Sequence, residues 1–136
     1  MKISAKAEYA CLAIIELARD AAPFLPRPAR EIAEAQGISE PYLVQILLRL
    51  KAAGLVQSAR GAVGGYQLAR DPESITVAEV ISAIDGPGER LGRKGGMAAR
   101  ALIDLLVNAR AAEQTVLTST SIADLAGRVP RNDWVL

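Results

Sequence analysis

Residues 30–70 read REIAEAQGISEPYLVQILLRLKAAGLVQSARGAVGGYQLAR, and this stretch decides the fold. It predicts two short helices that meet at Gly37, because glycine readily adopts the left-handed conformation that ends a helix. Ser39 is the expected N-cap of the second helix, and Pro41 falls in its first turn, where a missing N–H costs little. The second helix is therefore expected to begin at a defined residue.

The second helix is amphipathic. Its apolar side chains recur at three- and four-residue spacing and are expected to face the core: Leu43, Ile46, Leu47, Leu50 and Ala53. The residues left on the outer face are Pro41, Tyr42, Gln45, Leu48, Arg49 and Ala52. Such a face suits a DNA groove, because Gln can pair with adenine, Arg with guanine or phosphate, and apolar groups with thymine methyls. A surface helix of another small α domain is the alternative that this helix alone leaves open.

A two-stranded hairpin is predicted after these helices. Residues 55–60 and 66–70 form its strands, and its glycines can bring backbone amides close to a partner. The glycines of the tip are Gly61, Gly64 and Gly65. Arg60 stands at the base of the tip, where it is expected to reach phosphates or a narrow minor groove. Two helices followed by a basic, glycine-tipped wing predict a winged helix-turn-helix.

Two segments precede this unit. Residues 3–20 carry an apolar helical stripe that includes Cys11, which is expected to be a small core residue and not a reactive thiol. Residues 21–28 contain three prolines and predict a stiff connector, which Phe24 is expected to anchor on the core.

Further helices are predicted after the wing. Thr76 and Glu79 form a capping box that begins a helix, and Gly86 ends it. A helix is also expected over residues 97–117, which at 1.5 Å per residue is roughly 30 Å long. A short helix is expected after Ser121. Trp134 lies in a tail to which the sequence assigns no role.

The helix over residues 97–117 has two apolar edges. One is a seam suited to helix packing, made of Ala98, Leu102, Leu105, Ala109, Ala112 and Val116. The other is made of Ile103 and Leu106. Two edges predict that the helix contacts its own domain with one side and a second subunit with the other. An ordinary core helix is the alternative.

Five motifs in order resemble the Rrf2 family of bacterial transcription regulators. They are MKISAKAEYA (1–10), GISEPYLVQ (37–45), LKAAGLV (50–56), RGAVGGYQLAR (60–70) and ITV to IDGP (75–87). The resemblance implies a mainly α fold with a β-hairpin wing and a long C-terminal dimerisation helix. With the analysis above, it gives as candidate DNA-binding residues Lys6, Tyr9, Ser39, Pro41, Tyr42, Gln45, Arg49, Arg60, Gly61, Gly64, Gly65 and Tyr66. For Lys6 and Tyr9 the alternative is an ordinary solvated lysine and a half-buried tyrosine.

The chain also departs from the family pattern. Many family members hold an iron–sulfur cluster with three cysteines near residues 86–96, whereas this chain has Cys11 as its single cysteine and no histidine. No cluster, metal or other cofactor is therefore expected, and iron, redox or nitric oxide sensing does not carry over. Val44 stands where the family usually has an acid, and the wing reads GAVGG where the family usually has GPGGG. Both changes predict an operator sequence of its own.

Length and composition agree with a small regulator. The 136 residues suit one compact unit, divided into a winged helix-turn-helix at 1–86, a flexible loop at 87–96 and a dimerisation segment at 97–136. The net charge is +1, but residues 1–70 hold nine Lys or Arg against six acids. That excess predicts a basic patch. No run approaches the roughly 20 apolar residues of a membrane span, no secretory signal is recognised, and a lone cysteine fits the cytoplasm.

The sequence thus predicts a homodimeric regulator that binds double-stranded DNA at a palindromic operator, and repression is the expected direction. The operator, the target genes and any small-molecule effector are left open. The alternative is a winged-helix module that no longer binds DNA and serves as a protein–protein adaptor. An enzyme is not expected, because no residues resemble a nucleophile–base pair or a metal site.

Overall fold

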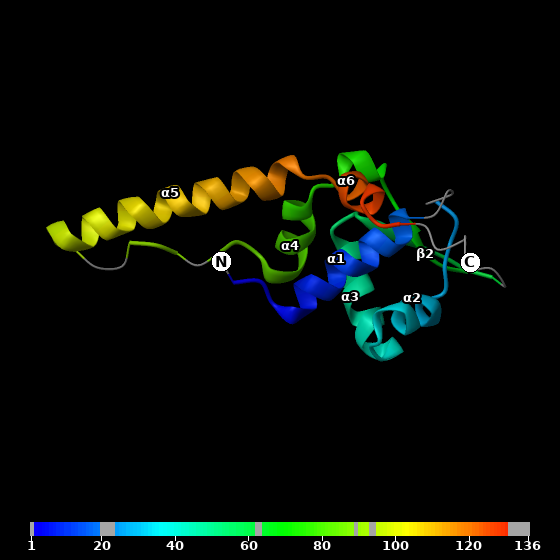
Figure 1. The fold of residues 1–136 in the computed structure, drawn as a ribbon. Coiled ribbons are helices and arrows are strands. Elements are labelled where there is room, and N and C mark those ends of the chain that lie inside the picture. Colours follow the sequence, from blue (N-terminus) through cyan, green and yellow to red (C-terminus); the bar gives the residue numbers. More distant parts are fainter. Residues whose placement is uncertain (1, 20–23, 62–63, 89, 93–94, 131–136) are drawn as a thin grey trace.

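The computed structural model describes residues 2–19, 24–61, 64–88, 90–92 and 95–130. Its elements in chain order are α1 (Ala5–Ala18), α2 (Ala29–Gln36), α3 (Glu40–Ala52), β1 (Val56–Ala59), β2 (Gly65–Leu68), the 3-10 turn η1 (Pro72–Ser74), α4 (Val77–Asp85), α5 (Met97–Ser119) and α6 (Ile122–Gly127). Figure 1 shows α1, α2, α3 and α6 gathered in one body, while α5 projects from it as a long rod beside α4. The predicted mainly α fold with a hairpin wing is confirmed.

Helix α1 lies at the centre of the core. It contacts α2, α3, α4 and α6, and its buried face carries Ala7, Ala10 and Ala13. Small side chains at these contacts let neighbouring helices approach closely. The helix begins at Ser4, whose hydroxyl accepts a hydrogen bond from the backbone N–H of Ala7 at 3.0 Å.

The turn between α2 and α3 has the predicted geometry. Gly37 has a φ of +70°, which is the left-handed conformation expected at the end of α2. The Ser39 hydroxyl accepts a hydrogen bond from the Tyr42 N–H at 3.3 Å, so Ser39 caps α3 as predicted. The expected inward position of Ala53 is wrong. Because α3 ends at Ala52, Ala53 is its exposed C-cap, and the helical spacing does not extend to it.

The wing is a short antiparallel hairpin. Val56 pairs with Leu68 and Ala59 pairs with Gly65, so its strands are shorter than the predicted 55–60 and 66–70. The connector adds a further backbone pair to the wing, since Arg27 and Tyr66 exchange N–H to O hydrogen bonds of 2.9 and 2.8 Å.

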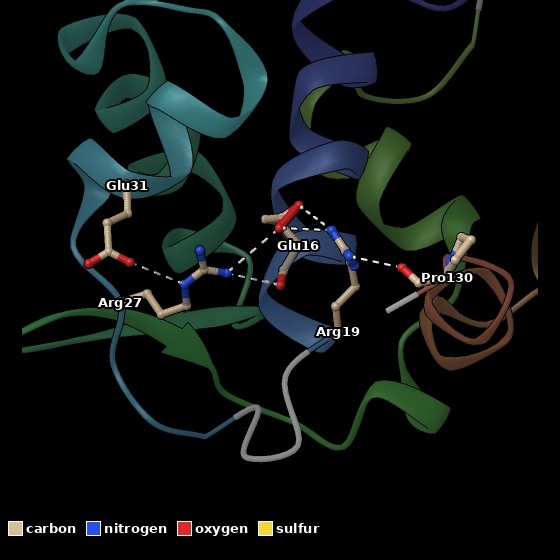
Figure 2. Close-up of polar contacts among 5 residues, drawn as sticks. All are labelled: Glu16, Arg19, Arg27, Glu31 and Pro130. Carbon is tan, nitrogen blue, oxygen red and sulfur yellow. Dashed lines mark hydrogen bonds and ion pairs between the residues drawn. The ribbon is translucent and has the colours of Figure 1, made fainter. Parts of the chain in front are cut away.

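The connector is attached by charge and not by an aromatic anchor. The prediction that Phe24 covers the core is wrong, because 48% of Phe24 is exposed. Instead, Figure 2 shows the Arg27 guanidinium between Glu16 of α1 and Glu31 of α2. It donates to the Glu16 carbonyl at 3.2 Å, and Arg19 joins Glu16 to the carbonyl of Pro130. A proline-rich segment with exposed apolar side chains is therefore held by its one arginine.

Helices α4 and α6 begin with capping boxes. That of α4 joins Thr76 and Glu79, as predicted, and that of α6 joins Ser121 and Asp124. Helix α6 returns to the body of the protein, where it contacts α1 and buries Ile122 completely. In the structure α6 thus belongs to the same body as α1, although the sequence grouped it with the dimerisation segment. Trp134 lies outside the described residues.

Helix α5 has no buried residue along its whole length. Within the body it contacts α4, so the expectation that one edge packs on its own domain does not hold for most of the helix. The half-buried Ile103 and Arg110 lie beside Gly92 and Gly88 of the preceding loop, while Leu106 of the second apolar edge is 41% exposed. In the described part of the chain, no helix combines the length and hydropathy that a bilayer crossing requires.

Candidate nucleic-acid interface

The outer face of α3 presents one amide among apolar groups. Pro41, Gln45, Leu48 and Ala52 are all exposed and recur at spacings of four, three and four, which places them on one side of the helix. Leu48 is 51% exposed, while Val44 beside it is half-buried. This face has the shape and the exposure of a helix that enters a groove.

Tyr42 does not belong fully to this face. Its ring meets that of Tyr9 edge-on, with centroids 5.9 Å apart, and both residues are half-buried against the core. The contact joins the start of α3 to α1. Lys6, one turn before Tyr9 on α1, is half-buried too. The predicted α1 positions therefore lie near the start of α3, and their contact with DNA stays a prediction.

Arg49 points away from the outer face of α3. Its Nη2 donates to the carbonyl oxygens of Ala83 at 3.3 Å and Ile84 at 2.8 Å, in the last turn of α4. That turn has no basic residue of its own, so its free carbonyls receive a cation from α3. The sequence predicts that Arg49 contacts DNA and does not reveal its bonds to α4. The one signal for these bonds is that the last turn of α4 has no basic residue.

The end of α4 is also tied to α1. The Asp85 carboxylate accepts hydrogen bonds from the backbone N–H of Ser4 at 3.1 Å and from the Ser4 hydroxyl at 2.5 Å. Since Arg49 binds the same turn, the last residues of α4 join the N-terminus of α1 to the recognition helix. Sequence reasoning did not find this junction, because its partners lie about 35 and 81 positions apart.

The wing places one cation in solvent. Arg60 is exposed at the end of β1 and makes no hydrogen bond or ion pair with the rest of the described chain. Lys51 of α3, by contrast, donates to the Ser58 hydroxyl of β1 at 2.8 Å. Residues 62–63 of the predicted tip lie outside the described residues. An exposed arginine of this kind can bind a phosphate, and the contact of Arg60 with DNA stays a prediction.

Two glycines of the wing lie where the backbone leaves no space for a side chain. A Cβ on Gly65 would lie 2.1 Å from the Arg27 carbonyl oxygen, and a Cβ on Gly64 would lie 2.6 Å from that of Ala59. Both positions therefore need glycine for the folding of the wing, independently of any partner. Gly61 has a φ of +108° and no neighbour within 4 Å, so it alone keeps the open backbone predicted for the tip.

Cys11 is not placed to react. It is half-buried on α1 against the core, and burial raises the pKa of its thiol to about 11, with smaller contributions from the carboxylates of Asp85 and Glu8. A thiol that stays protonated at neutral pH is a poor nucleophile and a poor metal ligand. The predicted role of Cys11 as a small core-facing residue agrees with this position.

The comparisons place the chain among transcriptional regulators. It matches the family model Rrf2, described as "Iron-dependent Transcriptional regulator", over residues 3–128. It is 38% identical over 134 residues to the HTH-type transcriptional regulator CymR of Bacillus subtilis, which covers 93% of this chain and 90% of that protein. It is also 46% identical over 85 residues to the HTH-type transcriptional regulator IscR of Escherichia coli, covering 62% of this chain and 52% of that protein.

Solved structures give the same assignment. The structure of CymR from B. subtilis, described as the global cysteine regulator, superposes with a TM-score of 0.84 at 37% identity, covering 96% of this chain and 99% of that one. The oxidised form of Staphylococcus aureus CymR superposes with a TM-score of 0.81 at 34% identity, covering 96% and 100%. Both superpositions cover 96% of this chain and so include the long helix α5.

The donor set does not fit an iron–sulfur cluster. Such clusters are held by several cysteine thiolates, in some cases with histidine. This chain has one cysteine and no histidine, and its described residues contain no group of three histidine, cysteine, aspartate or glutamate side chains suited to a metal ion. The chain therefore does not supply the cysteine and histidine ligands of an iron–sulfur cluster.

Proposed function

Because the chain belongs to the Rrf2 family and is a DNA-binding transcriptional regulator and not an enzyme, we propose that it binds a palindromic operator as a homodimer and represses transcription in the cytoplasm. The observation that carries the proposal is the exposed outer face of α3, together with the exposed Arg60 that follows β1. A recognition helix fits the major groove, and a basic wing fits the adjacent backbone.

Helix α5 supports the homodimer. The predicted seam residues are all exposed in the single chain: Ala98, Leu102, Leu105, Ala109, Ala112 and Val116. Leu106 is 41% exposed and Leu105 is 63% exposed. A helix of 23 residues with no buried side chain gains little from its own domain, whereas most helical stability in proteins comes from the packing of an apolar face. A second copy of α5 on the seam would supply the missing burial.

A two-fold dimer explains the expected operator. Two equivalent recognition helices bind half-sites about one DNA turn apart, roughly 34 Å, so the operator should be palindromic. Repression would follow if the bound dimer occupies a promoter and blocks transcription from it. We propose that this occupancy does not depend on a cluster, because the chain has a single cysteine and no histidine to hold one.

One observation favours the adaptor as a second candidate. Leu48 exposes an apolar side chain beside Val44 on the recognition helix, and the net charge of the chain is only +1. A protein partner could cover that apolar surface. Salt distinguishes the two candidates, because DNA binding releases counterions and weakens steeply with ionic strength, whereas an apolar protein contact hardly responds.

The test is selection of bound DNA from a random pool with purified, metal-free protein at two salt concentrations. We expect a palindrome whose affinity falls as salt rises. Arg60→Ala should weaken binding to every sequence and lower the salt slope by about one. If no sequence is enriched and binding ignores salt, the adaptor is the better assignment.

A further inference from the structure

The chemistry of the outer face of α3 is unusual for a DNA-reading helix. Of the four exposed residues on that side, only Gln45 can form hydrogen bonds with a base edge, and Pro41, Leu48 and Ala52 are apolar. Leu48 is 51% exposed and is the largest apolar group among them. An exposed leucine alone is ordinary. Leu48, however, lies one helical turn from the Gln45 amide, where a recognition helix would contact the bases.

The two cations of α3 are both directed to protein partners. Arg49 donates to the Ala83 and Ile84 carbonyls, and Lys51 donates to the Ser58 hydroxyl. Arginine or lysine on the O6 and N7 of guanine is the most common specific contact in the major groove. With both side chains engaged in this way, neither cation of α3 is directed at a guanine.

We propose that α3 reads adjacent A·T pairs, with the Gln45 amide on adenine and the Leu48 side chain on the C5-methyl group of thymine. The inference rests on the proposed function and names the DNA chemistry that it recognises. Glutamine pairs bidentately with N6 and N7 of adenine, and apolar side chains contact the thymine methyl. The two residues are three positions apart, so they are neighbours on the helix surface, about 5–6 Å apart at Cβ. That separation matches side chains that reach neighbouring base pairs.

The test uses the palindrome recovered by selection. Each thymine of one half-site is replaced in turn by deoxyuridine, which removes only the C5-methyl group, and the dissociation constant is measured by fluorescence anisotropy. At one thymine, next to the adenine read by Gln45, the wild-type protein should lose affinity about fourfold, as expected for one buried methyl group. Replacement in both half-sites should square that factor.

Two variants assign the effect to Leu48. For Leu48→Ala, deoxyuridine at the same position should no longer weaken binding, because the contact is already absent. For Leu48→Met, which conserves volume and apolar character, the sensitivity should persist. Since Leu48 is exposed, neither change disturbs the core, and matching thermal unfolding curves would verify this.

Four results would overturn the proposal, and they differ in meaning. An operator with no methyl-sensitive thymine, or with sensitivity that survives Leu48→Ala, removes Leu48 from recognition while DNA binding stands. A G·C pair at the position that Gln45→Ala relaxes would do the same for the A·T preference. Failure to recover any operator would instead reject the proposed function, and this inference with it.

Discussion

At the scale of single residues, Arg49 shows how a cation on the outer half of α3 can hold the helix in place. Its bonds to the Ala83 and Ile84 carbonyls fix α3 against the end of α4. Arg49→Ala should therefore weaken binding to all operators alike while leaving the salt slope unchanged, because no phosphate contact is lost. It should also lower the free energy of unfolding by about 1 kcal/mol, since the bonds are partly exposed.

The measurement is operator affinity at several salt concentrations, together with urea unfolding, for Arg49→Ala and Arg49→Lys. Lysine can still place a charge near the α4 carbonyls, so it should restore part of both properties. If Arg49→Ala instead lowers the salt dependence of operator affinity by about one and leaves the free energy of unfolding unchanged, Arg49 contacts a phosphate, as the sequence alone predicts.

Cys11 gives a prediction about pH. Its folded pKa of about 11 lies above the ordinary value of 9.0, so between these values the unfolded chain loses the thiol proton and the folded chain keeps it. Stability associated with the neutral thiol is complete below pH 9 and is lost as pH rises toward 11. Urea unfolding at pH 8 and pH 10 should show this loss in the wild type and not in Cys11→Ala. Reaction with a disulfide reagent at pH 7.5 should be slow until the protein is unfolded.

At the scale of elements, the wing and the connector depend on one glycine. Gly65→Ala would place a Cβ 2.1 Å from the Arg27 carbonyl oxygen, so the connector or β2 must move. We expect a loss of about 2 kcal/mol or more in the free energy of unfolding, and weaker operator binding as the wing shifts. Chemical denaturation and anisotropy would measure the two effects.

Gly127→Ala is the matched control. Gly127 lies at the end of α6 with no neighbour within 4 Å of a Cβ and an ordinary backbone conformation. Alanine there should raise stability slightly, by about 0.5 kcal/mol, through lower entropy of the unfolded chain. Equal effects at both positions would mean that the close approach of Gly65 to the connector is not important.

The elements also show what sequence can predict. Ser39, Gly37 and the Thr76–Glu79 capping box were predictable because each acts on residues within one helical turn. The side of α3 that faces the core followed from its spacing. Contacts between distant segments were not predictable, because no local pattern encodes them. Arg27 holds the connector where Phe24 was expected to, and Arg49 makes contacts with α4 that its position on α3 did not reveal.

At the scale of the whole molecule, the exposed seam of α5 is the proposed assembly surface. If its exposed seam holds two subunits together, a charge in the middle of that seam must be buried without a partner, which is strongly unfavourable. Leu105→Glu should therefore give monomers in sedimentation experiments, with operator affinity reduced by at least tenfold because each half-site binds alone. Leu105 is 63% exposed in the single chain, so the body should still fold. If the Leu105→Glu protein sediments as a dimer, the seam of α5 is not the dimer contact.

The position of Ile122 in the chain affects when the protein can fold during translation. This residue completes the core, with its N–H bonded to the Ile75 carbonyl at 2.8 Å and its side chain fully buried, yet it follows α5 in the chain. A nascent polypeptide therefore cannot close its DNA-binding body until α5 has already left the ribosome. A product released early, before residue 122, should be cleared by proteases, because it lacks a closed core. Translation thus completes the proposed operator-binding and assembly surfaces together, and a half-made chain should not compete for the operator.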